Sequence, residues 1–381
     1  MSHTPLKELL LDTLRRSGPM TFERYMAWCL YHPEFGYYTQ GRERTGVAGD
    51  YFTSSDLHPV FARLVARQAA EMWNATGRPQ PFTWVEMGAG RGLFACDFLS
   101  WSAGALPEFA SALDYVAIEP GSRQRERIGA RLAGAGVRGK VRLLADLEEL
   151  APATGCFFSN ELVDAFPVSV VTRTGGHLKE IYVTSEGNNL VEKPGPISDS
   201  AVAAYVARYA PQLEEGHRVE VNRQAQAWIH AVAAKLSRGF VLTIDYGDMA
   251  NRLFTPDRPR GTLLAYRVHN ASEDFYTAPG ETDLTAHVNF SALIDAGKAD
   301  GLEFAGFTTQ EKFLLALGEA NQFADVYDPG QSDLEILHGR LRLKRLISPE
   351  GIGNIFKILV QQRGVLKVQL TGWKFERPAA S

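Results

Sequence analysis

Residues 85–92 read VEMGAGRG, in which three glycines occupy alternate positions directly after an apolar run. That run, residues 82–87 (FTWVEM), is typical of a buried strand, and residues 93–101 (LFACDFLSW) are typical of the helix that follows it. A loop this poor in side chains lets a ligand approach the backbone closely. The stretch therefore predicts a strand, a ligand-binding turn and a helix, which together begin an α/β nucleotide-binding sheet.

Further strands and helices alternate along the chain, which predicts parallel crossovers and a doubly wound sheet. The expected strands are 114–119, 141–144, 156–159, 239–245 and, late in the chain, 354–362; the expected helices include 122–133 and 221–235. The segment 168–192 differs, because it alternates in polarity and carries the turn signals Gly175-Gly176 and Gly187-Asn188. It predicts an antiparallel hairpin or meander inserted into the sheet's connections.

These elements suggest four segments. Residues 1–77 are expected to form an N-terminal helical cover, and residues 78–250 the ligand-binding core with its β insertion at 168–192. Residues 251–350 are expected to cover the substrate side, and residues 351–381 to supply a final core strand and a tail. A nucleotide-binding core needs about half of 381 residues, so the remainder is available to recognise a substrate.

Composition excludes several classes of protein. The net charge is −4 without a block of like charge, so no broad basic face for nucleic acid is expected. Cys29, Cys96 and Cys156 are far apart and form no CxxC pair, which argues against a disulfide framework or a structural zinc site. No apolar run approaches the roughly 18 residues of a membrane span. The scattered cysteines fit a reducing compartment. Because Glu8 and Asp12 interrupt the leucines of the first helix, we expect an amphipathic helix that is neither a signal nor a transit peptide, and a cytoplasmic location.

The glycine loop itself favours a particular cofactor. Gly88, Gly90 and Gly92 form GxGxG, whereas a dinucleotide fingerprint is GxGxxG and would need glycine in place of Leu93. A turn that holds no pyrophosphate fits the amino-acid and ribose parts of S-adenosylmethionine. A bare tight turn is the alternative for the loop taken alone.

Acidic residues in and after the expected strands support the same cofactor. Glu119 ends the second strand, where a carboxylate can accept hydrogen bonds from both ribose hydroxyls. Asp146, just past the third strand, is placed to bind the adenine amino group. Glu86, inside the first strand, is included among the expected cofactor-binding residues.

The candidate chemistry lies in SNELVDAFPV, residues 159–168, directly after the fourth strand. Asn160 and Glu161 offer a carbonyl oxygen and a carboxylate, which suit an amino or guanidino nucleophile. Asp164 stands one helical turn after Glu161, so the two carboxylates could share a face. The alternative is that Asn160 caps a helix whose acids are solvated.

Longer motifs resemble those of the MidA-like family of class I methyltransferases, which includes the mitochondrial protein-arginine methyltransferase that assists complex I assembly. Besides VEMGAGRG and SNELVDAFPV, the matching stretches are YHPEFGYYT (31–39), GDYFTSSDLHPVF (49–61), IDYG (244–247), GETDLTAHVNFSAL (280–293) and GFTTQEKFLLALG (306–318). The resemblance implies a Rossmann-like class I fold, S-adenosyl-L-methionine as cofactor and methyl transfer to protein arginine. Within residues 49–61, Asp50, Thr53 and Ser54 could contact the methionine end of the cofactor, although an ordinary turn before a helix is the alternative.

Three functional interpretations stay open. The first is methyl transfer to a protein side chain, with arginine preferred and a respiratory-complex subunit as one candidate partner. The second is methyl transfer to a small molecule or a nucleic-acid base, although no basic surface favours nucleic acid. The third is a non-catalytic assembly factor that keeps the fold. A basic run at Arg340–Arg345 (RLRLKR) is expected to be a solvated helix face, with an acidic partner as the alternative.

Overall fold

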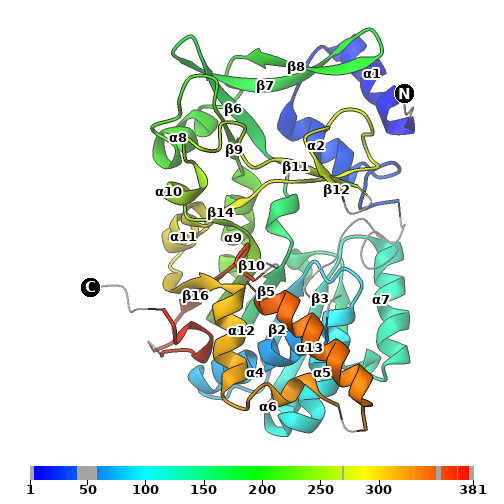
Figure 1. The fold of residues 1–381 in the computed structure, drawn as a ribbon, viewed down its shortest axis with the longest axis vertical. Helices are drawn as coiled ribbons and strands as arrows, with labels where there is room; N and C mark the ends of the chain where they lie inside the picture. The colour runs from blue at the N-terminus through cyan, green and yellow to red at the C-terminus, as the bar shows by residue number, and fades with distance from the viewer. Residues whose placement is uncertain are drawn as a thin grey trace. The chain divides into compact units, whose positions relative to one another are not determined.

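The computed structural model describes residues 4–40, 58–267, 270–328, 330–348, 353–366 and 368–376. The chain divides into two compact units (Figure 1). The parallel-sheet unit comprises Phe52–Leu162, Ile229–Tyr246 and Ile294–Ser381, and the antiparallel-sheet unit comprises Met1–Tyr51, Val163–Trp228 and Gly247–Leu293. Among the described residues, no helix is both long and apolar enough to cross a membrane.

The parallel-sheet unit is built on one sheet with the strand order β15-β16-β10-β5-β2-β3-β4. All strands on this path run in one direction except β16, which is antiparallel to both β10 and β15. The strand bounds are β2 Phe82–Met87, β3 Leu113–Ile118, β4 Val141–Leu144, β5 Ala153–Asn160, β10 Leu236–Asp248, β15 Glu303–Thr309 and β16 Phe356–Arg363. The predicted α/β doubly wound sheet is confirmed; β15 was not predicted.

Helices connect these strands. They are α4 Val60–Ala75, α5 Leu93–Ala105, α6 Pro107–Ala112, α7 Ser122–Gly134, α9 Arg223–Lys235, α11 Phe290–Ala299, α12 Gln310–Glu319 and α13 Asp333–Ile347, with short 3-10 turns η1 Arg138–Lys140, η2 Leu147–Glu149, η4 Ala324–Val326 and η5 Thr371–Trp373. Of these, α9 and α11 run from one unit into the other, as does strand β10.

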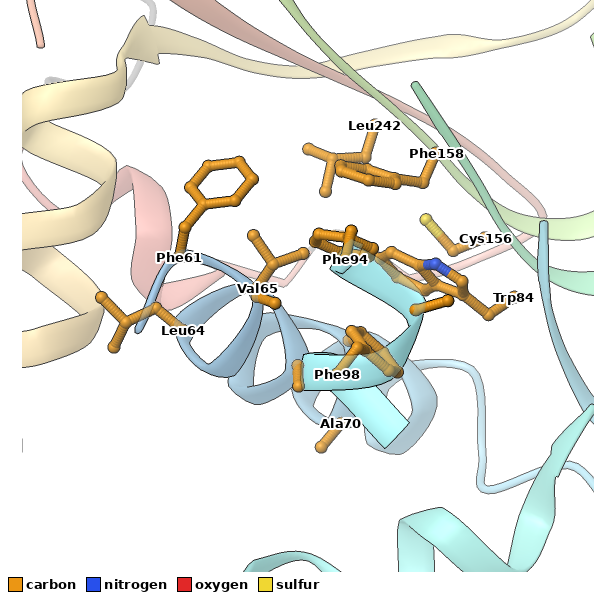
Figure 2. Close-up of a cluster of buried hydrophobic side chains, with 14 of the residues drawn as sticks. Phe61, Leu64, Val65, Ala70, Trp84, Phe94, Phe98, Cys156, Phe158 and Leu242 are labelled. Carbon is orange, nitrogen blue, oxygen red and sulfur yellow. The ribbon is translucent and has the colours of Figure 1, made fainter. Parts of the chain in front are cut away.

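An aromatic core fixes helix α5 to the sheet. Figure 2 shows Phe94 and Phe98 of α5 beside Trp84 of β2, with Phe158 of β5 next to them. The ring centroids of Phe94 and Phe158 are 4.6 Å apart, and those of Trp84 and Phe98 are 4.9 Å apart. Because aromatic side chains bury a large apolar area, this cluster fixes α5 against the sheet. It thereby fixes the position of the glycine loop between β2 and α5.

The antiparallel-sheet unit contains the predicted meander. Strands β6 Ser169–Thr174, β7 His177–Glu186 and β8 Asn189–Gly195 pair in sequence, and β1 Met20–Thr21 and β9 Arg218–Val221 extend the sheet. Gly175 and Gly176 have φ values of +60° and +76°, the pair of positive angles that a tight hairpin turn requires. The meander is confirmed; β1 and β9 were not predicted.

Smaller elements complete this unit. A second sheet has the order β12-β11-β13, with bounds Asn270–Ser272, Leu264–Arg267 and Asp283–Thr285, and β14 Val288–Asn289 pairs with the end of β10. The helices are α1 Pro5–Ser17, α2 Phe22–Tyr31, α8 Ser200–Tyr209 and α10 Ala250–Leu253, with the 3-10 turn η3 Val163–Ala165. The buried Glu220 carboxylate accepts hydrogen bonds from the backbone N–H groups of Thr262 and Leu263, and so ties the 261–263 segment to β9.

We predict that Phe98→Ala lowers the free energy of unfolding by about 3–5 kcal/mol, because it removes a fully buried ring from the aromatic core. Urea titration followed by tryptophan fluorescence measures the loss. Phe375→Ala is the matched control, since the Phe375 side chain is exposed and its removal should change stability by less than about 1 kcal/mol. Equal losses in the two variants would contradict the assigned core.

Candidate functional site

The three glycines of the loop all have left-handed backbones but meet different surroundings. Their φ values are +73°, +52° and +72° at Gly88, Gly90 and Gly92. A Cβ on Gly88 would lie 2.9 Å from Leu162 Cδ1, and one on Gly92 would lie 3.0 Å from Ile128 Cγ2. Among the residues that the structure describes, a Cβ on Gly90 would meet nothing closer than the Gly88 carbonyl oxygen at 3.9 Å. Two of the glycines therefore serve packing, while Gly90 faces open space.

Glu119 lies beside this loop. It follows β3 directly, and its backbone N–H donates to the Leu144 carbonyl oxygen at 3.0 Å. Its Oε1 accepts a hydrogen bond from the Gly121 N–H at 3.0 Å. Burial raises the pKa of Glu119, and hydrogen bonds from the Gly121 and Gly90 N–H groups, with the charge of Arg125, oppose that rise. The carboxylate thus interacts with the same Gly90 that faces open space.

Asp146 has a structural partner at the end of β4. Its Oδ1 accepts from the Glu148 N–H at 2.8 Å, while Glu149 Oε1 accepts from the Asp146 N–H at 3.0 Å. These reciprocal bonds form a capping box that begins η2. Binding of adenine by the exposed Asp146 stays a prediction.

Glu86 lies inside the fold. Only 5% of it is exposed, and its Oε2 accepts a hydrogen bond from Tyr115 Oη at 2.8 Å. Burial raises the pKa of Glu86 to about 8, partly opposed by the Tyr115 hydrogen bond. Glu86 is therefore mostly protonated at neutral pH, and its role in cofactor binding also stays a prediction.

The chain after β5 is held by the neighbouring strand β10. The Glu161 N–H donates to the Ile244 carbonyl oxygen at 3.0 Å, and the Leu162 N–H donates to Asp245 Oδ2 at 3.2 Å. Between these bonds Glu161 has a φ of +54°, a left-handed conformation that costs a non-glycine residue roughly 1–2 kcal/mol. A backbone outlier at the end of a central strand is a physical reason to suspect function.

Asn160 and Glu161 present two hydrogen-bond acceptors side by side. Asn160 Nδ2 donates to Glu161 Oε1 at 2.9 Å, which orients both side chains. Asn160 Oδ1 is buried, and no hydrogen-bond partner for it exists among the described residues. A buried acceptor without a partner costs about 1–3 kcal/mol, so a ligand that donates to it would gain binding energy there.

The expected helical relation between Glu161 and Asp164 is wrong. No helix runs through 161–164, because Glu161 is left-handed and η3 begins only at Val163. The alternative fails as well: Asn160 is the last residue of β5 and caps no helix, and Asp164 is only 5% exposed and so not solvated. The Asp164 carbonyl oxygen accepts from the Ala286 N–H at 2.9 Å, within the antiparallel-sheet unit.

Two further outcomes concern residues around this site. Asp50, Thr53 and Ser54 lie outside the described residues. Asp245 was missed as a functional candidate, although it is fully buried and positions the chain after β5. The signal was present in the sequence, since Asp245 is the acid of the IDYG motif at 244–247.

Comparisons with known proteins agree with this geometry. A family described as "Putative S-adenosyl-L-methionine-dependent methyltransferase" matches residues 64–308. The mitochondrial protein arginine methyltransferase NDUFAF7 of Danio rerio is 25% identical over 91% of this chain and 84% of its own length; the Homo sapiens protein is 26% identical over 99% and 87%. A Burkholderia thailandensis protein whose crystal structure holds S-adenosyl-homocysteine is 30% identical, with a TM-score of 0.86 over 98% of this chain and 97% of that one.

The expected cytoplasmic location is wrong. The relatives from Danio rerio, Drosophila melanogaster and Homo sapiens are all named as mitochondrial proteins. The expectation rested on the scattered cysteines and on the first helix, which was not expected to be a targeting peptide. Scattered cysteines argue against an oxidising compartment but do not distinguish one reducing compartment from another.

The raised pKa of Glu86 predicts a pH dependence of stability. In the unfolded chain this carboxyl has its ordinary pKa of 4.5, against about 8 when folded. Between those values the folded state binds more protons, so the free energy of unfolding should fall as the pH rises from about 5 to about 8. Glu86→Gln keeps an acceptor for Tyr115 without a titrating group and should flatten that fall.

Thermal unfolding at a series of pH values measures this difference. The control is Glu126→Gln, which alters an exposed acid on α7 and should follow the parent protein. If Glu86→Gln and Glu126→Gln lost stability equally with rising pH, burial of the Glu86 charge would not be the cause.

Proposed function

The chain belongs to the family of S-adenosyl-L-methionine-dependent methyltransferases whose model matches residues 64–308, and we propose that its methyl acceptor is an arginine side chain of a protein. It has the class I methyltransferase fold and uses S-adenosyl-L-methionine. The observation that carries the proposal is the paired acceptor group of Asn160 and Glu161 at the end of β5. The names of the curated relatives support arginine as the acceptor.

The loop after β2 fits the proposed cofactor. The open side of Gly90 leaves room for a ligand against the backbone, as the amino-acid part of the cofactor requires. Glu119, held beside Gly90, has acceptor oxygens for two ribose hydroxyls. When bound, S-adenosyl-L-methionine supplies an electrophilic methyl group on a positively charged sulfur.

Asn160 and Glu161 supply what an arginine acceptor needs. A guanidinium carries five N–H donors in one plane, and a carboxylate beside a carbonyl oxygen accepts from that plane. Glu161 would orient the group and receive the proton that it must lose, while Asn160 Oδ1 would accept a second N–H. Since the guanidinium pKa exceeds about 12, positioning is the larger contribution and proton removal the smaller one.

Other expectations stay predictions. They are that Asp164, Asp50, Thr53 and Ser54 take part in the site, that segments 1–77 and 251–350 cover the substrate side, that the acceptor protein is a respiratory-complex subunit, and that nucleic acid is excluded as a substrate. A small-molecule acceptor and a non-catalytic assembly role are the outcomes to be distinguished.

We predict that Glu119→Ala weakens S-adenosyl-homocysteine binding by about 1–3 kcal/mol, the cost of leaving polar groups unpaired. Isothermal titration calorimetry measures it. Glu126→Ala, which removes an exposed acid of α7, should bind like the parent protein. Unchanged affinity in Glu119→Ala would remove Glu119 from the cofactor site.

We predict that Glu161→Gln retains cofactor affinity but transfers methyl groups at least about a hundredfold more slowly, since it keeps the shape and loses the charge. The assay incubates labelled methyl donor with lysate proteins, then separates the methylated amino acids after acid hydrolysis. Label should appear as methylarginine.

Glu161→Gly separates the side chain from the backbone conformation. Glycine adopts a φ of +54° without strain, so this variant should fold at least as stably as the parent while also losing transfer. If Glu161→Gln transferred methyl groups as fast as the parent protein, Glu161 would not be the carboxylate that acts on the acceptor. Label found in another amino acid, or only in small molecules, would refute the arginine acceptor.

A further inference from the structure

Helix α13 (orange in Figure 1) has two apolar faces, of which only one is covered. The inner face, formed by Gly339, Leu343 and Leu346, is buried. A Cβ on Gly339 would lie 3.3 Å from both His58 Nε2 and Val326 Cγ1, so the helix packs closely at this point. The inner face therefore accounts for how the parallel-sheet unit holds α13.

The outer face has a row of leucines that are largely exposed and so contribute little to the core. Leu334, Leu337 and Leu341 are 61%, 51% and 53% exposed. Their spacing of three and then four residues places them in one line along the helix. Exposed single leucines are ordinary, but three in line at coiled-coil spacing form a seam that fits another helix.

The charges around this seam are basic. Lys344 continues the line of leucines, and Arg345 and His338 flank it; all three side chains are exposed. Two acids lie at the start of the helix. The Glu335 carboxylate accepts hydrogen bonds from the Ser332 N–H and hydroxyl in the helix cap, and Asp333 lies about three helical turns from Lys344 and Arg345. The outer face thus offers leucines to an apolar surface and cations to an acidic one.

We propose that the outer face of α13, defined by Leu334, Leu337, Leu341, Lys344 and Arg345, binds an acidic amphipathic helix of a protein partner. Leucines along the seam of the partner fill the gaps between these leucines, and acidic side chains beside that seam pair with Lys344 and Arg345. The binding does not depend on which acceptor the enzyme methylates.

Other occupants fit less well. A membrane surface favours a broad apolar face with aromatic side chains, whereas this seam is one leucine wide. A second copy of α13 would bring two basic faces together, and two short seams bury less than the roughly 1,200 Å² of a standard interface. An acidic helix instead pairs with the basic side chains of this face, and a transient complex needs less buried area than a standard interface.

The test uses a fluorescein-labelled helical peptide of three heptads, with leucine at the seam positions and glutamate beside them. Fluorescence anisotropy with the full-length protein should show saturable binding that weakens as salt rises. A peptide with lysine in place of glutamate should not bind.

Two kinds of variant locate the binding face. The combined change Leu337→Ser and Leu341→Ser, and separately Lys344→Glu with Arg345→Glu, should each weaken binding of the acidic peptide at least about tenfold. The matched control is Leu366→Ser, which alters a leucine that is 87% exposed and lies outside α13, and it should bind like the parent. Since all these side chains are exposed, the variants should keep the parent melting temperature and the parent affinity for S-adenosyl-homocysteine.

Several results would overturn the proposal. They are absence of binding by the acidic peptide, equal binding by the parent and both seam variants, and equal binding of the acidic and basic peptides. Binding to vesicles containing phosphatidylglycerol that the leucine variant loses, without peptide binding, would assign the face to a membrane. A parent dimer in sedimentation equilibrium that the leucine variant abolishes would assign it to a second copy.

Discussion

The close approach of Gly88 to Leu162 is the constraint on which the site depends. It brings the loop after β2 against the chain leaving β5. A Cβ at position 88 would lie 2.9 Å from Leu162 Cδ1, so the leucine side chain would have to move, and the φ of +73° favours glycine as well. These strands are neighbours in the sheet, with Met87 in register with Ser159. Because neighbouring parallel strands end at the same edge, the glycine loop and the Asn160–Glu161 pair are separated by little more than one strand spacing.

Strand β10 supplies the second half of this constraint. It pairs with β5 up to Asn160 and then holds the next two N–H groups through the Ile244 carbonyl oxygen and the Asp245 carboxylate. Each such hydrogen bond contributes on the order of 1 kcal/mol, and bonds to a charged group contribute more. Together they can offset the cost of the left-handed Glu161, so its conformation is set by β10 and not by local preference.

That distinction explains which features the sequence could predict. Strands β2 and β4 were predicted to the residue, because a short apolar run bounded by turn residues reports a strand locally. Strand β15 was missed because EFAGFTT is short, contains Gly306 and lacks clear alternation. The capping box of Asp146 and Glu149 was also readable, since an acid three residues after a cap residue is its ordinary pattern.

The parts of the site that were not predicted are those made by tertiary contacts. No local pattern distinguishes a glutamate in a left-handed turn from one in a helix, and the i, i+3 spacing of Glu161 and Asp164 favoured the helix. The role of Asp245 likewise depends on the register between β10 and β5, which a single sequence does not contain. The MidA-like motifs identified the family but not the geometry within the matching segments.

Two consecutive residues, Asn160 and Glu161, each lower the stability of the fold. Selection for stability alone would replace both. The buried Oδ1 of Asn160, which has no hydrogen-bond partner among the described residues, costs about 1–3 kcal/mol, and the left-handed backbone of Glu161 costs roughly 1–2 kcal/mol. Glycine at 161 would relieve the second cost, and a fitting apolar side chain at 160 the first. Burial of the aromatic core around Trp84 and Phe98 contributes stability that opposes both costs. In a fold otherwise consistent with its sequence, two such destabilising features occur together at the end of one strand. This is expected where the side chains are arranged to bind a ligand as well as to pack against the rest of the chain.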